Sequence, residues 1–140
     1  MADEISVKIV RRVNSRELIH LYKEAGWWKP EYPEDAAYIS SLVRDSFCFA
    51  GAFHKKRLVG MGRSFSDGVG DAYIQDVTVL REFRGKGLGR RIVLAIVEHL
   101  RSRGIDWIGL IAEPGSERFY REMGFRAMNG YVPMIWAVDE

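Results

Sequence analysis

The sequence predicts a single α/β domain with a mixed sheet over residues 1–140, in the element order β-α-α-β-β-β-α-β-α-β-β. First, a β-branched run ending at Val79 and Leu80 passes into a loop with three glycines, and Leu88, Ile92 and Leu100 then recur at helical spacing. Second, strand-like and helix-like patterns follow one another along the whole chain. Third, 140 residues with 47% hydrophobic content are enough to bury one core.

The first part of the chain contains a strand pattern and two helix patterns. Residues 5–10 alternate like a strand, and residues 14–17 have the form of a capping box. The helix that this box opens has Leu18, Leu21 and Tyr22 on one face and ends near Gly26. An aromatic, proline-stiffened connection over residues 27–33 leads to a second expected helix over residues 34–44.

Strand patterns dominate the rest of the chain. Residues 47–53 and 58–65 read as a hairpin, and residues 72–80 as the next strand. The helix after the glycine loop extends to about Arg103 and is stopped by Gly104. A strand over residues 105–112, a short helix over residues 116–123 and a final strand pair over residues 125–128 and 131–138 complete the expected fold.

Composition excludes several kinds of partner. A net charge of +2 without a block of five basic residues gives no support for nucleic acid as a partner, so none is expected. The single cysteine, Cys48, excludes an intramolecular disulfide framework and a multi-cysteine zinc site, and its apolar neighbours indicate a core residue. No apolar stretch reaches the ~20 residues of a membrane span, and the acidic N-terminus is unlike a signal peptide. We therefore expect a cytoplasmic protein that contacts no membrane and holds no metal.

The loop Arg84-Gly85-Lys86-Gly87-Leu88-Gly89 is the most informative segment of the chain. Glycines let a ligand approach the backbone closely, and the first turn of the following helix has unpaired N–H groups. With the helix dipole behind them, these groups form a site for a phosphate or a pyrophosphate. Arg84, Lys86, Arg90 and Arg91 add positive charge, so the segment is predicted to be a diphosphate cradle.

Two other nucleotide sites fit this segment less well. The P-loop string GxxxxGK[ST] does not occur. The dinucleotide string GxGxxG fails because Arg90 and Arg91 follow the last glycine of the loop. A strand–loop–helix–strand unit with Glu113 after its second strand does fit a dinucleotide unit superficially, but too few residues follow Glu113 to complete a doubly wound sheet.

Read as [RQ]-x-x-G-x-[GA], residues 84–89 resemble the acyl-CoA-binding loop of the GCN5-related N-acetyltransferase (GNAT) superfamily. Residues 116–125, Ser-Glu-Arg-Phe-Tyr-Arg-Glu-Met-Gly-Phe, resemble the family's later motif, a short helix that carries a tyrosine and ends in Gly-Phe. Residues 58–68 and 74–79 are similar to the small plant and cyanobacterial serotonin N-acetyltransferase branch. The resemblance covers most of the chain and implies an acyltransferase that uses acetyl-CoA as cosubstrate.

The resemblance also implies catalytic roles. Tyr120 occupies the position of the helix tyrosine that protonates the departing thiolate, whose ordinary pKa is ~8.5; the alternative is that it packs beside Phe119. A protonated amine cannot attack, so some group must take its proton or hold it. Asp76, on the strand before the cradle, is the candidate base or amine anchor, and a salt bridge to Arg63 is the alternative.

Binding residues follow from the same resemblance. The residues expected to contact the cofactor are Val77, Thr78, Val79, Arg84, Gly85, Lys86, Gly87, Leu88, Gly89, Arg90 and Ser116. Backbone groups of the first three would pair with the pantetheine arm like an added strand. Glu113 stands where family members often carry asparagine, and a carboxylate there would repel phosphate. Trp27, Trp28 and Tyr32 are expected to border the acceptor, and the alternative is that the tryptophans pack the first helix onto the sheet.

Three functions remain open from the sequence. The first is an acetyl-CoA-dependent N-acetyltransferase acting on a small, aromatic primary amine. The second acetylates a protein lysine or N-terminus. The third is a non-enzymatic acyl-CoA-binding or nucleotide-binding module, in which Tyr120 and Asp76 are structural. The expected partners are acetyl-CoA and a small-molecule amine, and the sequence leaves monomer and homodimer open.

Overall fold

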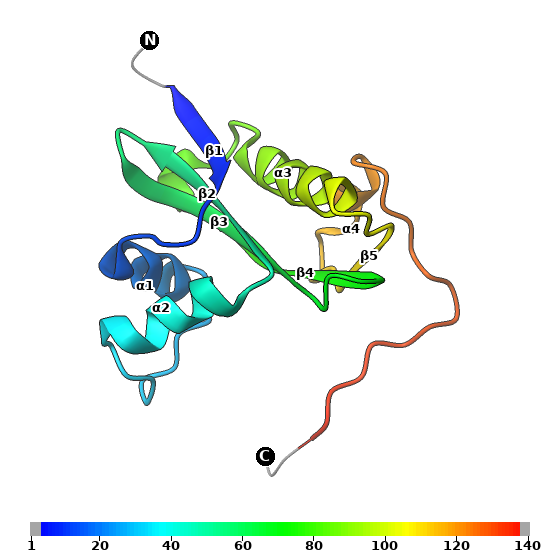
Figure 1. Ribbon diagram of the computed structural model, residues 1–140, viewed down its shortest axis with the longest axis horizontal. Helices are drawn as coiled ribbons and strands as arrows, with labels where there is room; N and C mark the ends of the chain where they lie inside the picture. Colours follow the sequence, from blue (N-terminus) through cyan, green and yellow to red (C-terminus); the bar gives the residue numbers. More distant parts are fainter. Residues whose placement is uncertain (1–3, 138–140) are drawn as a thin grey trace. The chain divides into compact units, whose positions relative to one another are not determined.

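The structure, a computed structural model, describes residues 4–137 (Figure 1). Contacts divide the chain into two compact units, Met1–Leu110 and Ile111–Glu140. The single domain expected over residues 1–140 stays a prediction. Within residues 4–137, no helix has both the length and the apolar composition needed to cross a bilayer.

A five-stranded sheet in the order β1-β2-β3-β4-β5 forms the centre of the first unit. Its strands are β1 (Ile5–Ile9), β2 (Cys48–His54), β3 (Arg57–Ser66), β4 (Asp71–Val79) and β5 (Trp107–Leu110). The first four strands pair antiparallel, and β5 is parallel to β4. The predicted mixed sheet is therefore confirmed, although β5 is shorter than the expected strand over residues 105–112.

Helix α1 (Ser15–Glu24) begins at the expected N-cap, because the Asn14 side chain accepts a hydrogen bond from the Glu17 amide at 3.0 Å. The reciprocal bond of a capping box is not found among the described residues, and the Glu17 carboxylate accepts from the Leu58 amide at 3.0 Å instead. Its buried face includes Leu18, Leu21 and Tyr22, as expected. Helix α2 (Ala36–Asp45) has Asp35 as its N-cap. Figure 1 shows α1 and α2 on one face of the sheet and α3 (Leu88–Ser102) on the other.

Glycines of β3 allow α3 to approach the sheet closely. A Cβ at Gly62 would lie 2.8 Å from Ile92 Cγ2 and 3.1 Å from Ile96 Cδ1, both on α3. The same imagined Cβ would lie 3.3 Å from Val77 Cγ2, so Val77 also points to the α3 face. This packing fixes the helix whose first turn follows the glycine loop.

A β-bulge interrupts the pairing of β3 with β4. Met61 pairs with Thr78 and Arg63 pairs with Gln75, so Gly62 alone opposes two residues, Asp76 and Val77. Asp76 adopts a left-handed backbone conformation, with φ of 59°. The bulge moves Asp76 from the α3 face, where Ile74 lies opposite Ser64, to the face covered by α1 and α2. Simple alternation, which places Asp76 on the same face as Ile74, is therefore wrong here.

The second unit contains a turn at Pro114 and Gly115, the helix α4 (Glu117–Arg121), and a segment after it to which no helix or strand is assigned within the described residues. The final strand pair expected over residues 125–128 and 131–138 is not formed in the described residues, and Val138 lies outside them. The turn at Asn129 and Gly130 is present, but Tyr131 to Ala137 have no strand partner. Pro133 lacks an amide hydrogen and interrupts any ladder there, and Trp136 is 81% exposed.

Candidate active site

The predicted diphosphate cradle forms the entrance to α3, after the short 3-10 helix η1 (Arg81–Phe83). Gly85 and Gly87 have φ of 80° and 77°, and Gly87 is the N-cap of α3. The amide of Arg91 bonds to the Gly87 carbonyl at 3.1 Å, which leaves the N–H groups of the preceding turn without an intrahelical acceptor. A Cβ on Gly85 or Gly87 would meet no atom within 4 Å, so the loop offers open space and free donors to an anion.

All four cationic residues of the cradle are exposed, and two of them also donate hydrogen bonds to backbone carbonyls. Arg84 Nε donates to the Val79 carbonyl at 2.9 Å and fastens the loop to the end of β4. Arg91 Nη2 donates to the Ile5 carbonyl at 2.8 Å and ties α3 to β1. Lys86 and Arg90 are exposed at the loop. The positive charge predicted from the sequence is therefore present, but two of the four cations also hold the loop in place.

The edge of β4 nearest the cradle is open within the first unit. Strand β5 pairs with β4 only from Asp71 to Ile74. Thr78 and Val79 pair with β3 on one side and have no strand partner on the other within the described residues of this unit. Unpaired N–H and C=O groups on a strand edge can pair with an extended ligand. The predicted cofactor-contacting segment Val77 to Val79 thus has the backbone geometry that an extended arm needs.

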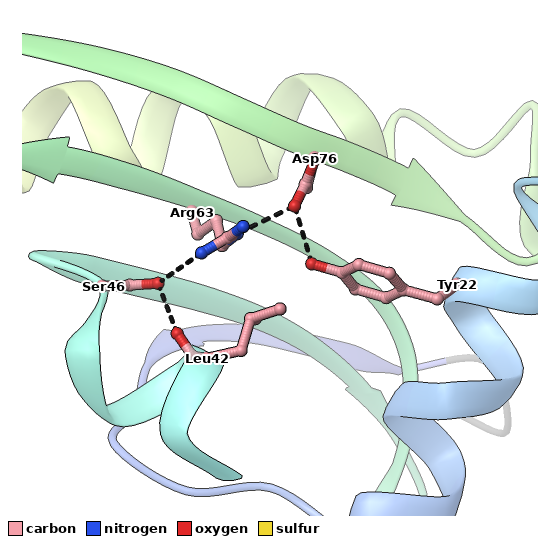
Figure 2. A network of polar contacts seen from close by, with 5 residues as sticks. All are labelled: Tyr22, Leu42, Ser46, Arg63 and Asp76. Atoms are coloured by element: carbon pink, nitrogen blue, oxygen red, sulfur yellow. Dashed lines mark hydrogen bonds and ion pairs between the residues drawn. The ribbon is translucent and has the colours of Figure 1, made fainter. Parts of the chain in front are cut away.

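Asp76 is the centre of a polar network on the opposite side of the sheet from α3 (Figure 2). Arg63 Nε donates to Asp76 Oδ2 at 2.8 Å, and Tyr22 Oη donates to the same oxygen at 2.7 Å. The side chains of Arg63 and Asp76 are only 12% and 16% exposed. The salt bridge to Arg63, considered from the sequence as the alternative to catalysis, is therefore formed. Whether Asp76 also contacts the amine stays a prediction.

Arg63 and Tyr22 are themselves held in place. Arg63 Nη1 donates to Ser46 Oγ at 3.3 Å, and the Ser46 hydroxyl donates to the Leu42 carbonyl at 2.7 Å (Figure 2). Burial raises the pKa of the Tyr22 phenol well above its usual range, although the positive charge of Arg63 opposes the shift. Tyr22 is therefore a neutral hydrogen-bond donor at ordinary pH.

Aromatic residues of α1, α2 and their connection form one cluster. Its members are Tyr22, Trp27, Trp28, Tyr32 and Tyr38, which we call the aromatic cluster. Trp27 meets Tyr22 edge to face at 5.8 Å between ring centres, and Trp28 meets Tyr32 in the same manner at 5.3 Å. Trp28 Nε1 is buried and has no hydrogen-bond partner in the described residues. Trp27, Trp28 and Tyr32 therefore pack against aromatic rings of α1, α2 and their connection. Packing of the first helix onto the sheet by the tryptophans stays a prediction, as does contact with an acceptor.

Tyr120 lies in the second unit, on α4. Its ring packs edge to face on Phe119 at 4.9 Å and on Phe125 at 5.8 Å. Burial raises the pKa of the Tyr120 phenol, and the nearby Glu113 carboxylate raises it further. Ser116 Oγ donates to the Glu113 carbonyl at 2.7 Å, so this hydroxyl already has a partner inside the turn. The acid role of Tyr120 and the cofactor contact of Ser116 stay predictions.

Sequence reasoning missed Tyr22 and Ser46 as parts of this site. The helical pattern places Tyr22 on the apolar core face of the first helix, and its partner Asp76 is 54 positions away. A tyrosine on a buried helix face needs a hydrogen-bond partner for its hydroxyl. The presence of Tyr22 on that face therefore indicates that a polar residue lies next to it.

The sequence profile of the acetyltransferase (GNAT) family matches residues 12–125. The uncharacterized N-acetyltransferase ycf52 of Gracilaria tenuistipitata var. liui is 32% identical over 129 residues, which cover 89% of this chain and 69% of that protein. Two plant relatives match shorter regions. A histone acetyltransferase of Glycine max is 39% identical over 83 residues, 59% of this chain and 36% of its own. Serotonin N-acetyltransferase 2, chloroplastic, of Oryza sativa subsp. japonica is 42% identical over 69 residues, 49% of this chain and 34% of its own.

A solved structure shows the same fold. The GNAT family acetyltransferase of Streptococcus pneumoniae TIGR4 superposes with a TM-score of 0.80 at 23% identity, over 98% of this chain and 100% of the other. The GNAT family generally uses acetyl-CoA, which agrees with the free donors of the cradle and the open edge of β4. The chain therefore belongs to the GNAT acetyltransferase family and is an N-acetyltransferase.

Proposed function

We propose that this N-acetyltransferase transfers an acetyl group from acetyl-CoA to the primary amine of a small aromatic compound. The observation that carries the proposal is the position of Asp76. Its side chain is held by Tyr22, and the Tyr22 ring contacts Trp27 and Trp28. A carboxylate next to aromatic surface suits a ligand that joins an amine to an aromatic ring.

Residues of the first unit fit the cosubstrate. The N–H groups of the first turn of α3, with exposed Lys86 and Arg90, would hold its pyrophosphate. The unpaired edge of Val77 to Val79 would hold the extended arm. Acetyl-CoA supplies the activated acetyl group as a thioester. A backbone N–H of the same edge would polarise the carbonyl that the amine attacks.

Two chemical roles toward the acceptor amine are open to Asp76. As an anchor, its carboxylate accepts a hydrogen bond from the amine and orients the nitrogen lone pair. As a base, it takes a proton from an ammonium whose pKa is ~10.4 in alkyl amines. Both roles need a carboxylate that the solvent can reach, and Asp76 is 16% exposed.

Tyr120 is proposed as the general acid that returns a proton to the departing thiolate. Its raised pKa keeps the phenol protonated at neutral and mildly alkaline pH, as an acid requires. The proposal for Tyr120 rests on its place in the family motif over residues 116–125.

Acetylation of a protein lysine or N-terminus is the second candidate, and the histone acetyltransferase of Glycine max supports it. The serotonin N-acetyltransferase of rice supports the small aromatic amine instead. We favour the small amine because the aromatic cluster lies beside Asp76 through Tyr22. A cytoplasmic location and the choice between monomer and homodimer stay predictions.

A thiol-release assay with acetyl-CoA and a panel of acceptors tests the proposal. The panel contains tryptamine, serotonin, spermidine, an aminoglycoside and a lysine peptide. We expect the two arylalkylamines to give the highest kcat/KM. A higher value for the lysine peptide would favour the second candidate, and a higher value for the aminoglycoside or the polyamine would refute the aromatic preference.

A further inference from the structure

The two oxygens of Asp76 differ in their surroundings. Oδ2 accepts from both Tyr22 Oη, at 2.7 Å, and Arg63 Nε, at 2.8 Å. Oδ1 receives no hydrogen bond from the residues that the structure describes, and it is not among their buried unpaired atoms. A carboxylate oxygen has two lone pairs. Oδ1 is therefore the oxygen that remains available to a ligand.

Both donors to Oδ2 are rigid. Tyr22 is 7% exposed. The centre of its ring lies 5.8 Å from that of Trp27 and 6.5 Å from that of Trp28. Arg63 is fixed at its other end by Ser46 (Figure 2). Two rigid donors on one oxygen set the rotation of the carboxylate.

The backbone of Asp76 also requires support. A non-glycine residue with φ of 59° in a bulged strand is strained unless the surrounding structure holds it. Hydrogen bonds from α1 and β3 to the side chain supply that support from two directions. Strain of this kind concentrates where side-chain placement matters for function.

Arg63 also changes what Asp76 can bind. The guanidinium compensates the charge of the carboxylate at 2.8 Å, so a further cation gains less from Asp76 than it would from a lone carboxylate. A hydrogen bond from a neutral amine is not weakened in the same way. The pair therefore favours the neutral, nucleophilic form of the acceptor.

We propose that Tyr22 is a positioning residue for the acceptor amine, because with Arg63 it holds Asp76 Oδ2 and leaves Oδ1 for the nitrogen of the acceptor. The inference rests on the proposed function, in which Asp76 contacts the amine. It adds that the α1 residue Tyr22 acts on the acceptor only through Asp76.

A double-mutant cycle with Tyr22→Phe and Asp76→Asn tests the inference. In the wild-type background, Tyr22→Phe is expected to lower kcat/KM for the amine about tenfold, the usual effect of losing a hydrogen bond to a charged group. KM for acetyl-CoA should stay unchanged within about twofold, since the cradle is not touched. In the Asp76→Asn background, Tyr22→Phe should change kcat/KM by less than about twofold.

Tyr73→Phe is the matched control. Tyr73 lies on β4, is 52% exposed and donates no hydrogen bond to any described residue, so its hydroxyl should not matter. Should Tyr22→Phe fail to fold, Arg63→Lys replaces it in the cycle, because it keeps the charge and removes the Nε donor.

Equal effects of Tyr22→Phe in both backgrounds would overturn the inference, as would an unchanged kcat/KM for the amine. If the wild-type protein acetylates no amine, the proposed function fails. The same cycle is then measured on amine binding by calorimetry, where additive effects or the absence of amine binding overturn the inference.

Discussion

Replacing Asp76 by asparagine removes one charge with little change in shape. Asparagine is, after glycine, among the residues that best tolerate a left-handed backbone, so the φ of 59° adds no new strain. The amide keeps one oxygen that can accept from Tyr22 or Arg63. The variant therefore isolates the carboxylate charge from the bulge that carries it.

The expected loss of stability follows from the burial of the ion pair. Removing one partner of a fully buried pair costs about 3–5 kcal/mol, whereas exposed pairs contribute about 0–1 kcal/mol. The side chains of Asp76 and Arg63 are 16% and 12% exposed, so the pair is closer to the buried case than to the exposed one. We expect a loss of about 2–3 kcal/mol, because one hydrogen bond survives, and a fall in Tm of roughly 6–12 °C for a chain of this size.

The expected loss of activity depends on pH. Removing a general base costs about 10²-fold or more in kcat. The loss of kcat in Asp76→Asn, relative to the wild type, should be greatest at low pH. It should shrink as pH rises toward ~10.4, because a growing fraction of the amine is then already neutral. Thiol release with tryptamine from pH 6.5 to 9.5 measures it, and Asp71→Asn, an exposed aspartate on β4, is the control.

Two results separate the possible roles of Asp76. A deficit that is equal at every pH indicates an anchor without proton transfer. An unchanged kcat/KM for the amine, with the loss of stability still observed, would show that Asp76 is only a structural partner of Arg63. It would refute both a base role and an anchor role for Asp76.

Other changes test other parts of the protein. Tyr120→Phe should lower kcat about 10²-fold while acetyl-CoA still binds, and turnover close to wild type would show a packing role. Glu113→Gln removes a negative charge that raises the pKa of Tyr120, so this pKa should fall. The decline of kcat at alkaline pH should then begin at a lower pH than in the wild type, and an unchanged pH profile contradicts this. Gly87→Glu should abolish calorimetric binding of acetyl-CoA, and Gly104→Glu, with a similar φ of 84°, should not. Gly62→Ala should cost about 1–3 kcal/mol in urea unfolding, since its methyl would lie 2.8 Å from Ile92.

Local signals in the sequence account for much of the fold. The N-cap at Asn14 and the glycine loop before α3 are decided by residues within a few positions of one another, and both are confirmed. The pairing of Asp76 with Arg63 was also foreseeable, because a charge within a central strand needs a partner.

The β-bulge at Asp76 could not be read from the chain. It lies in the register between β3 and β4, where Val77 and the α3 residues Ile92 and Ile96 all surround Gly62, and these segments are far apart in sequence. The link from Asp76 to Tyr22 depends on that bulge, since without it Asp76 would lie on the other face of the sheet. The last strand pair failed for a related reason, because alternation over residues 131–137 predicts a strand but supplies no neighbour to pair with it.

Competition between a small aromatic amine and a lysine peptide for the same enzyme shows which class of acceptor the protein prefers. Wild-type protein is given acetyl-CoA with equal concentrations of serotonin and a lysine peptide, and both acetylated products are measured by mass spectrometry at early times. The product ratio equals the ratio of the two kcat/KM values. We expect acetylated serotonin to exceed acetylated peptide by about tenfold or more, and an excess of acetylated peptide would contradict the proposed aromatic-amine specificity.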